Sequence, residues 1–128
     1  MSVPSPVAGK RCLVLDDEFL IALDIQQILE HAGAAQVDCV ASASEAMKLL
    51  GSTAQFDVAI LDIKLSEADG TSLGVAAALA SKGTPFILLT GMRTDDVHAR
   101  RFPDVPVVEK PYDAVALLAA VGRALAGQ

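Results

Sequence analysis

The sequence predicts an α/β protein built on a doubly wound, five-stranded parallel sheet with strand order 2-1-3-4-5. Short apolar runs alternate with helix-like segments along the whole chain. Such alternation implies right-handed crossovers and a parallel sheet with helices on both faces. Residues 58–61 are continuously apolar, which is typical of a strand covered on both sides. In this strand order the switch point lies between strands 1 and 3.

The predicted strands are short and rich in valine, isoleucine and leucine, and they cover residues 11–15, 37–41, 56–61, 85–89 and 105–108. Pro106 interrupts the last of these runs. Because proline cannot donate to a strand ladder, we expect this strand at an edge of the sheet.

The predicted helices follow the strands and cover about residues 19–31, 45–50, 71–82, 94–101 and 113–126. The first has an apolar stripe that includes Ile21, Ile25 and Leu29. Ser44 is the predicted N-cap of the second. Gly33 and Gly83 follow the first and third helices and are typical helix stops.

The last helix is apolar on nearly every side. Val115, Leu118 and Leu125 are predicted to face the core, which leaves a second apolar face made of Leu117, Val121 and Ala124. A helix with two apolar faces usually buries both. We therefore expect the predicted helix at 94–101, the last strand and the last helix to form a protein-interaction surface, including one for a homodimer.

Length and charge restrict the class of protein. The chain of 128 residues suits one domain, placed at residues 10–126 after a flexible lead-in at residues 1–9, with no output domain. No apolar run approaches the ~20 residues that cross a bilayer, so no membrane contact is expected. The net charge of -6 argues against nucleic-acid binding. Cys12 and Cys39 lack CxxC spacing and are expected to be buried, reduced thiols of a cytoplasmic protein.

Polar residues gather where the predicted strands end. Asp16 and Asp17 follow the first strand, Asp62 the third, Thr90 the fourth and Lys110 the fifth. In an open α/β sheet, ligands bind at the carboxyl ends of the strands beside the switch point. These five side chains are therefore the candidate site.

The residue types at this edge favour phosphoryl transfer. Converging carboxylates repel one another, and a divalent cation relieves the repulsion. Oxygen ligands favour Mg²⁺. A carboxylate, a hard cation, a lysine and a hydroxyl together suit transfer of a phosphoryl group onto the carboxylate, with Asp62 as the nucleophile.

At these motifs the chain resembles the receiver domain of a two-component response regulator, a flavodoxin-like fold shared with the bacterial chemotaxis regulator. The matching motifs are LVLDDE with Asp16 and Asp17, AILDIKL with Asp62, ILLTG with Thr90, and VEKPY with Lys110. The resemblance covers about residues 10 to 126, nearly the whole chain.

The resemblance implies roles for each matching residue. Asp62 would accept a phosphoryl group from a histidine kinase or a phosphotransfer protein. Asp16 and Asp17 would hold Mg²⁺ together with Asp62 and the backbone carbonyl of Lys64. Lys110 would pair with Asp62 and then with a phosphoryl oxygen.

The resemblance further implies that Thr90 turns toward the phosphoryl group and switches the interaction surface for a downstream protein. It implies a cis peptide between Lys110 and Pro111, and no enzymatic activity beyond phosphorylation and dephosphorylation of the chain itself.

The sequence also departs from the family pattern. Val107 stands where many receivers have an aromatic switch residue, and Lys64 and Met92 are unusual neighbours of Asp62 and Thr90. The fourth and fifth strands resemble those of a subfamily with a Phe-Ala-Thr-Gly-type fourth strand.

Other readings of these residues remain open at this point. Asp16 and Asp17 could cap the first helix, and Asp62, Thr90 and Lys110 could be ordinary loop residues. A small hydrolase acting through an aspartyl-phosphate is a second reading, although Lys64 stands where such enzymes usually carry an aspartate. A degenerate receiver used only for docking is a third. A flavodoxin-like cofactor binder is a fourth, but no phosphate-cradling loop follows the first strand.

Overall fold

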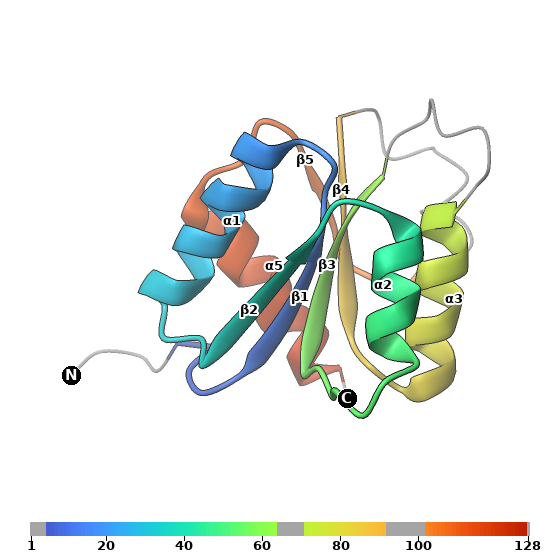
Figure 1. Cartoon of the computed structure of the whole chain (residues 1–128). Coiled ribbons are helices and arrows are strands. Elements are labelled where there is room, and N and C mark those ends of the chain that lie inside the picture. Colours follow the sequence, from blue (N-terminus) through green and yellow to red (C-terminus); the bar gives the residue numbers. More distant parts are fainter. Residues whose placement is uncertain (1–4, 64–70, 92–101, 128) are drawn as a thin grey trace.

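The computed structural model describes residues 5–63, 71–91 and 102–127. Within these ranges the chain forms a five-stranded, fully parallel sheet in the order β2-β1-β3-β4-β5, with helices on both faces (Figure 1). The described elements are, in chain order, β1 (Arg11–Leu15), α1 (Phe19–His31), β2 (Gln36–Val40), α2 (Ala43–Leu50), β3 (Val58–Ile63), α3 (Thr71–Lys82), β4 (Phe86–Thr90), β5 (Val107–Glu109) and α5 (Ala114–Ala126). The predicted fold class and strand order are confirmed.

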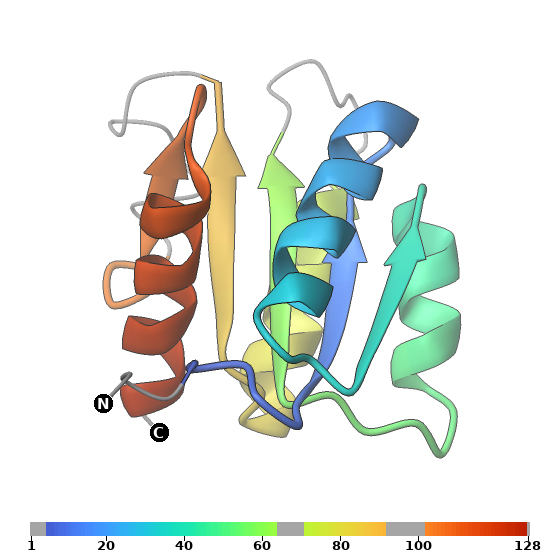
Figure 2. The same ribbon diagram turned by 90° about the vertical axis from the view of Figure 1, so that its left-hand side faces the viewer.

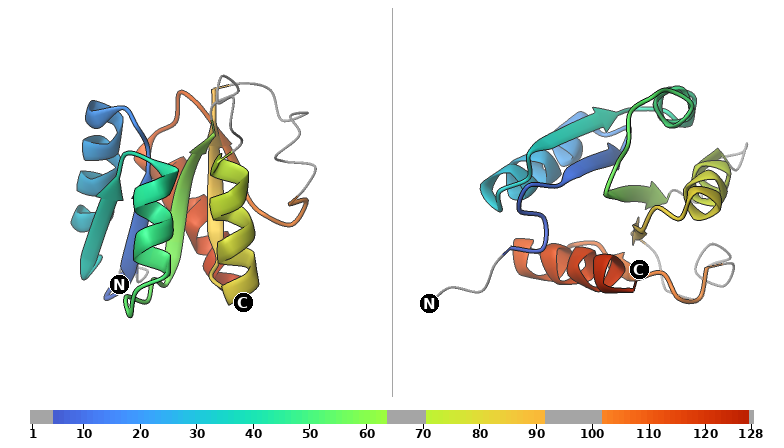
Figure 3. Two further views of the ribbon diagram at one scale, coloured as in Figure 1. Left: turned by 45° about the vertical axis from the view of Figure 1, so that its right-hand side comes forward. Right: turned by 90° about the horizontal axis from the view of Figure 1, so that it is seen from below.

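Helices α1 and α5 cover one face of the sheet, and α2 and α3 cover the other (Figures 1 and 3). The strands alternate their side chains between these two layers. In β3, Val58 and Ile60 belong to the α1–α5 side, whereas Ala59, Leu61 and Ile63 belong to the α2–α3 side. All six residues of β3 are buried. This strand is therefore the centre of the fold.

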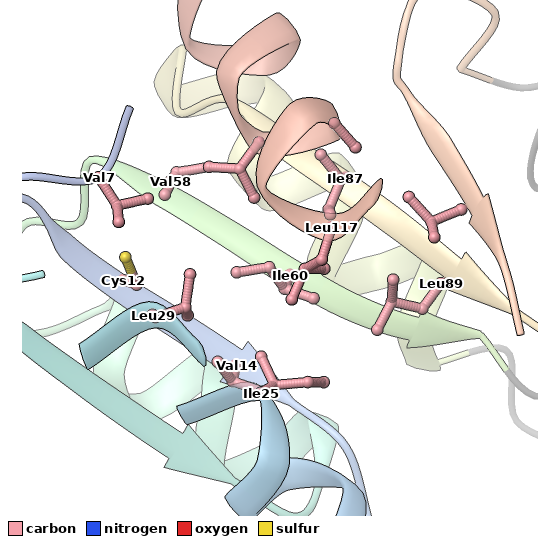
Figure 4. Close-up of a cluster of buried hydrophobic side chains, with 13 residues drawn as sticks. Val7, Cys12, Val14, Ile25, Leu29, Val58, Ile60, Ile87, Leu89 and Leu117 are labelled. Carbon is pink, nitrogen blue, oxygen red and sulfur yellow. The ribbon is translucent and has the colours of Figure 1, made fainter. Parts of the chain in front are cut away.

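The α1–α5 core is a cluster of branched aliphatic side chains and one thiol (Figure 4). Ile25 and Leu29 of α1 meet Val14, Ile60 and Leu117 there, and each of these five is fully buried. Burying a side chain of this size stabilises the fold by roughly 1.5–3 kcal/mol. The apolar stripe predicted for the first helix is confirmed.

Several predicted boundaries move by one or two residues. β3 runs to Ile63, so Asp62 lies inside the strand rather than after it. The N-cap of α2 is Ser42 and not Ser44, because the Ser42 hydroxyl oxygen accepts a hydrogen bond from the Glu45 N–H at 3.1 Å. Pro106 lies just before β5, which is an edge strand as predicted. The helix predicted at 94–101 lies outside the described residues.

The prediction for the buried face of α5 is wrong. Leu117, Ala120 and Val121 are the buried residues of this helix, and they follow the i, i+3, i+4 spacing of one helical face. Val115 is 77% exposed. Leu118 and Leu125 are only partly buried at the border of the core. The sequence of α5 has two apolar stripes, and the stripe that contains Leu117 and Val121, rather than the predicted one, packs against the sheet.

Two further predictions are corrected by burial. Residues 5–9 were expected to belong to a flexible lead-in, but Val7 is fully buried in the α1–α5 core. Cys12 is buried as expected, whereas Cys39 is exposed, because β2 is an edge strand with several exposed positions. Among the described residues, no helix is both long and apolar enough to span a bilayer.

Candidate functional site

Three carboxylates from two neighbouring strands meet at the carboxyl edge of the sheet. β1 and β3 pair in parallel with Leu15 opposite Leu61, so the residue after each of these two lies at the same level. Asp16 and Asp62 occupy those positions, and Asp17 follows. One carboxylate oxygen from each of the three lies within 4.8 Å of the others.

The burial of this group makes its charge important. Asp16 and Asp62 are each only 3% exposed, whereas Asp17 is exposed. Two carboxylates at such a separation repel by roughly 3 kcal/mol at an effective dielectric constant of about 20. Asp16 is held in place locally: its Oδ1 accepts a hydrogen bond from the Glu18 N–H at 2.9 Å, and its own N–H donates to the Val40 carbonyl at 3.1 Å.

Lys110 brings a cation to the buried carboxylate. Its Nζ lies 2.6 Å from Oδ1 of Asp62, and the two side chains are 22% and 2% exposed. A hydrogen bond between two charged groups at this distance is stronger than one between neutral groups. Lys110 follows β5 directly, and the predicted cis peptide between Lys110 and Pro111 is present.

Thr90 links the fourth strand to the same edge. It is the last residue of β4, it lies opposite Ile63 in the β3–β4 register, and it is 3% exposed. Its carbonyl accepts a hydrogen bond from the Lys110 N–H at 2.8 Å. Thr90 is therefore next to the strand position that follows Asp62, and its backbone positions the start of the Lys110 turn.

This donor set fits a hard divalent cation. All three candidate ligands are carboxylates that gather within one small space, and oxygen donors of this kind are the ligands that Mg²⁺ uses in proteins. The predicted fourth ligand, the backbone carbonyl of Lys64, lies outside the described residues, as does Met92. Asp16, Asp17 and Asp62 are thus the residues that could hold Mg²⁺.

Comparison with known proteins agrees with this geometry. The model of the response regulator receiver domain family matches residues 12–122, which is most of the chain. This chain belongs to the receiver domain family.

Two solved structures illustrate the similarity. SdrG from Pseudomonas melonis Fr1, known from the solution structure of its BeF3-activated conformation, has 33% sequence identity to this chain. The match covers 92% of this chain and 98% of SdrG, with a TM-score of 0.76. The response regulator TrrA from Thermotoga maritima, solved in complex with Mg²⁺ and BeF, has 28% sequence identity to this chain. The match covers 91% of this chain and 99% of TrrA, with a TM-score of 0.74.

A curated relative is longer than this receiver. The transcriptional regulatory protein PdtaR from Mycobacterium tuberculosis is 29% identical over 119 residues, which are 91% of this chain. The match spans only 57% of the length of PdtaR. Receivers of two-component systems interact with histidine kinases or phosphotransfer proteins, and Mg²⁺ is typical of the family. The resemblance to the Phe-Ala-Thr-Gly subfamily stays a prediction.

One residue beside the receiver site was not singled out from the sequence. Tyr112 packs against the α1–α5 core. Its burial, followed by the nearby charges of Asp24, Asp16 and Asp62, raises its pKa to about 12. Its place two residues after Lys110, in VEKPY, was the signal that could have identified it. Tyr112 therefore lies close enough to Asp24 of α1 and to the site carboxylates Asp16 and Asp62 for their charges to act on it.

Val107, which stands where many receivers have an aromatic residue, is half-buried in β5. It packs against the α2–α3 core. Because valine has no aromatic ring, Val107 cannot act together with Thr90 as the aromatic switch residue of many receivers does.

The rim of the site includes exposed apolar side chains. Phe19 and Leu20, in the first turn of α1, are 75% and 76% exposed, and Leu23 is 37% exposed. These three residues form the α1 apolar patch. Figure 2 shows that the first turns of α1 and α5 lie at the edge of the sheet where the strands end, so the patch is beside the carboxylates.

Proposed function

We propose that this receiver is the phosphoacceptor of a two-component phosphorelay and that Asp62 is the residue that becomes phosphorylated. The observation that carries the proposal is the position of Asp62: a buried carboxylate held 2.6 Å from the Lys110 ammonium and beside the carboxylates of Asp16 and Asp17. A metal ion and a lysine on either side of a nucleophilic carboxylate suit phosphoryl transfer.

The proposed donor is a phosphohistidine of a histidine kinase or a phosphotransfer protein. A carboxylate oxygen of Asp62 attacks the phosphorus, and an O–P bond forms while the N–P bond breaks. The bonding pair returns to the imidazole nitrogen, and the ring leaves neutral because its other nitrogen carries the proton. Hydrolysis of the aspartyl-phosphate by water later returns Asp62 and inorganic phosphate.

The neighbouring side chains then have distinct tasks. Lys110 pairs with Asp62 before transfer and with a phosphoryl oxygen afterwards. The Thr90 hydroxyl donates a hydrogen bond to another phosphoryl oxygen and so links the modification to β4 and β5. Mg²⁺, when held by Asp16, Asp17 and Asp62, neutralises negative charge on the phosphoryl group. In this proposal the chain catalyses only its own phosphorylation and dephosphorylation.

The donor protein is proposed to dock over the α1 apolar patch. A donor must bring its phosphohistidine to Asp62, so its surface has to contact the rim of the site. Phe19, Leu20 and Leu23 offer apolar area there, and the nearby Glu18 and Asp24 are exposed acids. This combination favours a helical donor surface with an apolar centre and flanking lysine or arginine residues.

The output surface is proposed to comprise the helix predicted at 94–101, β5 and α5. Only the last two are described: β5 is an edge strand, and Val115 at the start of α5 is exposed. Homodimer formation through this surface is part of the proposal. Sedimentation with and without beryllofluoride tests it, and a monomer at every concentration in both conditions would contradict the homodimer.

Incubation with acetyl phosphate and Mg²⁺ tests the acceptor role. The expected result is a mass increase of one phosphoryl group in the wild-type protein and none in Asp62→Asn. A small hydrolase would instead release phosphate from varied monoesters with repeated turnover. A docking module without phosphoacceptor activity would show neither modification nor turnover.

A further inference from the structure

The segment before β1 crosses the ends of two helices. Residues 5–9, here called the strap, turn back on themselves, because the Lys10 N–H donates to the Val7 carbonyl at 2.9 Å. The Gly9 N–H donates to the Gly33 carbonyl, just beyond α1, at 2.9 Å. Figure 2 shows this segment running from the C-terminal end of α5 to the start of β1.

The side chain of Val7 fills a gap in the core. It is fully buried and belongs to the cluster that contains Cys12, Leu29 and Val58. Figure 4 shows Val7 beside Cys12 and Val58, at the end of the cluster away from Leu89. Val7 therefore seals the core at the edge of the sheet opposite the phosphoacceptor site.

The strap also lies close to both helices that cover this face. A methyl group built on Gly122 of α5 would lie 3.5 Å from Cβ of Pro6. A methyl group built on Gly33, after α1, would lie 3.6 Å from the Ala8 backbone. At both positions an added methyl group would be in ordinary van der Waals contact with the strap, so the strap lies close against both helices.

We infer that the strap is a latch that holds the C-terminal half of α5 against the sheet and opens independently of global unfolding. α5 has a second tie at its other end, because it begins shortly after Lys110, whose ammonium contacts Asp62. The strap thus fixes the end of α5 that the phosphoacceptor site does not. This inference does not rest on the proposed function.

The buried thiol of Cys12 reports on the latch. Cys12 is fully buried beneath the strap. Burial, followed by the charge of Asp57, raises its pKa to about 11, so the closed state reacts slowly with thiol reagents. When the strap opens, the thiol meets solvent while β1 stays paired. Cys39 is the other cysteine and is exposed, so the experiment uses the Cys39→Ser background.

Three valine-to-alanine variants separate local from global opening. Val7→Ala weakens the strap; Val75→Ala removes the same two methyl groups from α3, on the other face of the sheet, where Val75 is fully buried. Val115→Ala is the exposed control on α5 itself. Labelling of Cys12 with a thiol reagent under native conditions should be roughly tenfold faster in Val7→Ala, and within about twofold of the parent in the other two variants.

Hydrogen exchange locates the opening. The latch predicts that Val7→Ala lowers the protection of amides in the C-terminal half of α5 and leaves those of β3 unchanged. It also predicts that Gly122→Ala, whose new methyl group would touch Pro6, slows Cys12 labelling severalfold. Equal acceleration of labelling by Val75→Ala and Val7→Ala would show that the thiol is exposed only by global unfolding. That result, or unchanged labelling in Val7→Ala, would overturn the inference.

Discussion

Lys110 and Asp62 are brought within 2.6 Å of each other although β4 separates the strands from which they come. The contact is possible because parallel strands end at one edge of the sheet, so β3 and the turn after β5 face the same space. Asp62 is buried, and its negative charge is offset there by a side chain that itself keeps some contact with water. Removal of either partner therefore has a predictable cost.

Replacement of Lys110 by alanine should destabilise the protein most in the absence of metal. The variant leaves buried Asp62 beside Asp16 without the ammonium group, and we expect a loss of roughly 3–5 kcal/mol in the free energy of unfolding. Mg²⁺ should restore more stability to Lys110→Ala than it adds to the wild type. Chemical denaturation with and without Mg²⁺ measures both effects. Lys48→Ala, which removes an exposed lysine, is the control, and equal losses in the two variants would contradict this account of the pair.

Magnesium should stabilise the wild-type protein through Asp16, Asp17 and Asp62. A ligand that binds only the folded state adds roughly 2.7 kcal/mol when its concentration is one hundred times its Kd. Asp17→Asn should lose most of this gain while keeping its fold, because Asp17 is exposed. Thermal melting against Mg²⁺ concentration is the measurement, with Asp104→Asn as a control of the same charge change. A full Mg²⁺ response in Asp17→Asn would remove that residue from the proposed ligand set.

The two apolar faces of α5 should differ sharply in stability experiments. Leu117→Ala opens a cavity in the core and should cost roughly 2–5 kcal/mol, because Leu117 is fully buried. Val115→Ala should change stability by less than about 0.5 kcal/mol. Urea denaturation of both variants decides which face packs. A larger loss of stability for Val115→Ala than for Leu117→Ala would show that the face with Val115 is the buried one, as the sequence pattern predicted.

Tyr112 should make the protein less stable at high pH. Its pKa is raised to about 12 in the folded chain, against about 10 in an unfolded one. Between these two pH values the folded state binds more protons than the unfolded state. The stabilisation that comes from the raised pKa of Tyr112 is therefore complete below pH ~10 and is lost as the pH rises through about 12. Tyr112 is the only tyrosine, so phenolate absorbance follows it alone. A titration midpoint near 10 in the folded protein would contradict the burial, and Tyr112→Phe should remove this part of the pH dependence.

The α1 apolar patch should matter for protein donors and not for small ones. Phe19→Ser and Leu20→Ser should slow phosphoryl transfer from a phosphorylated kinase or phosphotransfer protein by roughly tenfold or more, since a few well-packed, desolvated residues carry most of the binding energy of an interface. The rate with acetyl phosphate should be unchanged. Met47→Ser, at an exposed apolar position on α2, is the matched control. Equal slowing with both donors would place the defect in the site itself.

The sequence was sufficient for the strand order and for the meeting of the polar residues. The bounds predicted for α1, α3 and β1 agree with those of the structure. Asp16, Asp17, Asp62 and Lys110 converge because a parallel sheet brings the ends of its strands to one edge, and that follows from the alternation of strands and helices alone.

The errors have physical reasons as well. α5 carries two apolar stripes, and sequence periodicity does not determine which of them packs against the sheet. Val7 lies among polar and small residues, so its burial depends on a gap between α1 and α5 that only the folded chain possesses. Tyr112 was not singled out because its position depends on the direction of the turn after Lys110.

The central claim is that Asp62 is the carboxylate that takes the phosphoryl group. Borohydride reduction after treatment with acetyl phosphate and Mg²⁺ tests it most directly, because an aspartyl-phosphate is reduced to homoserine and the modified residue is then read by peptide mass spectrometry. The account predicts homoserine at position 62, absent without Mg²⁺ and absent in Asp62→Asn. Homoserine at position 16 or 17, or the same yield in Asp62→Asn, would contradict it.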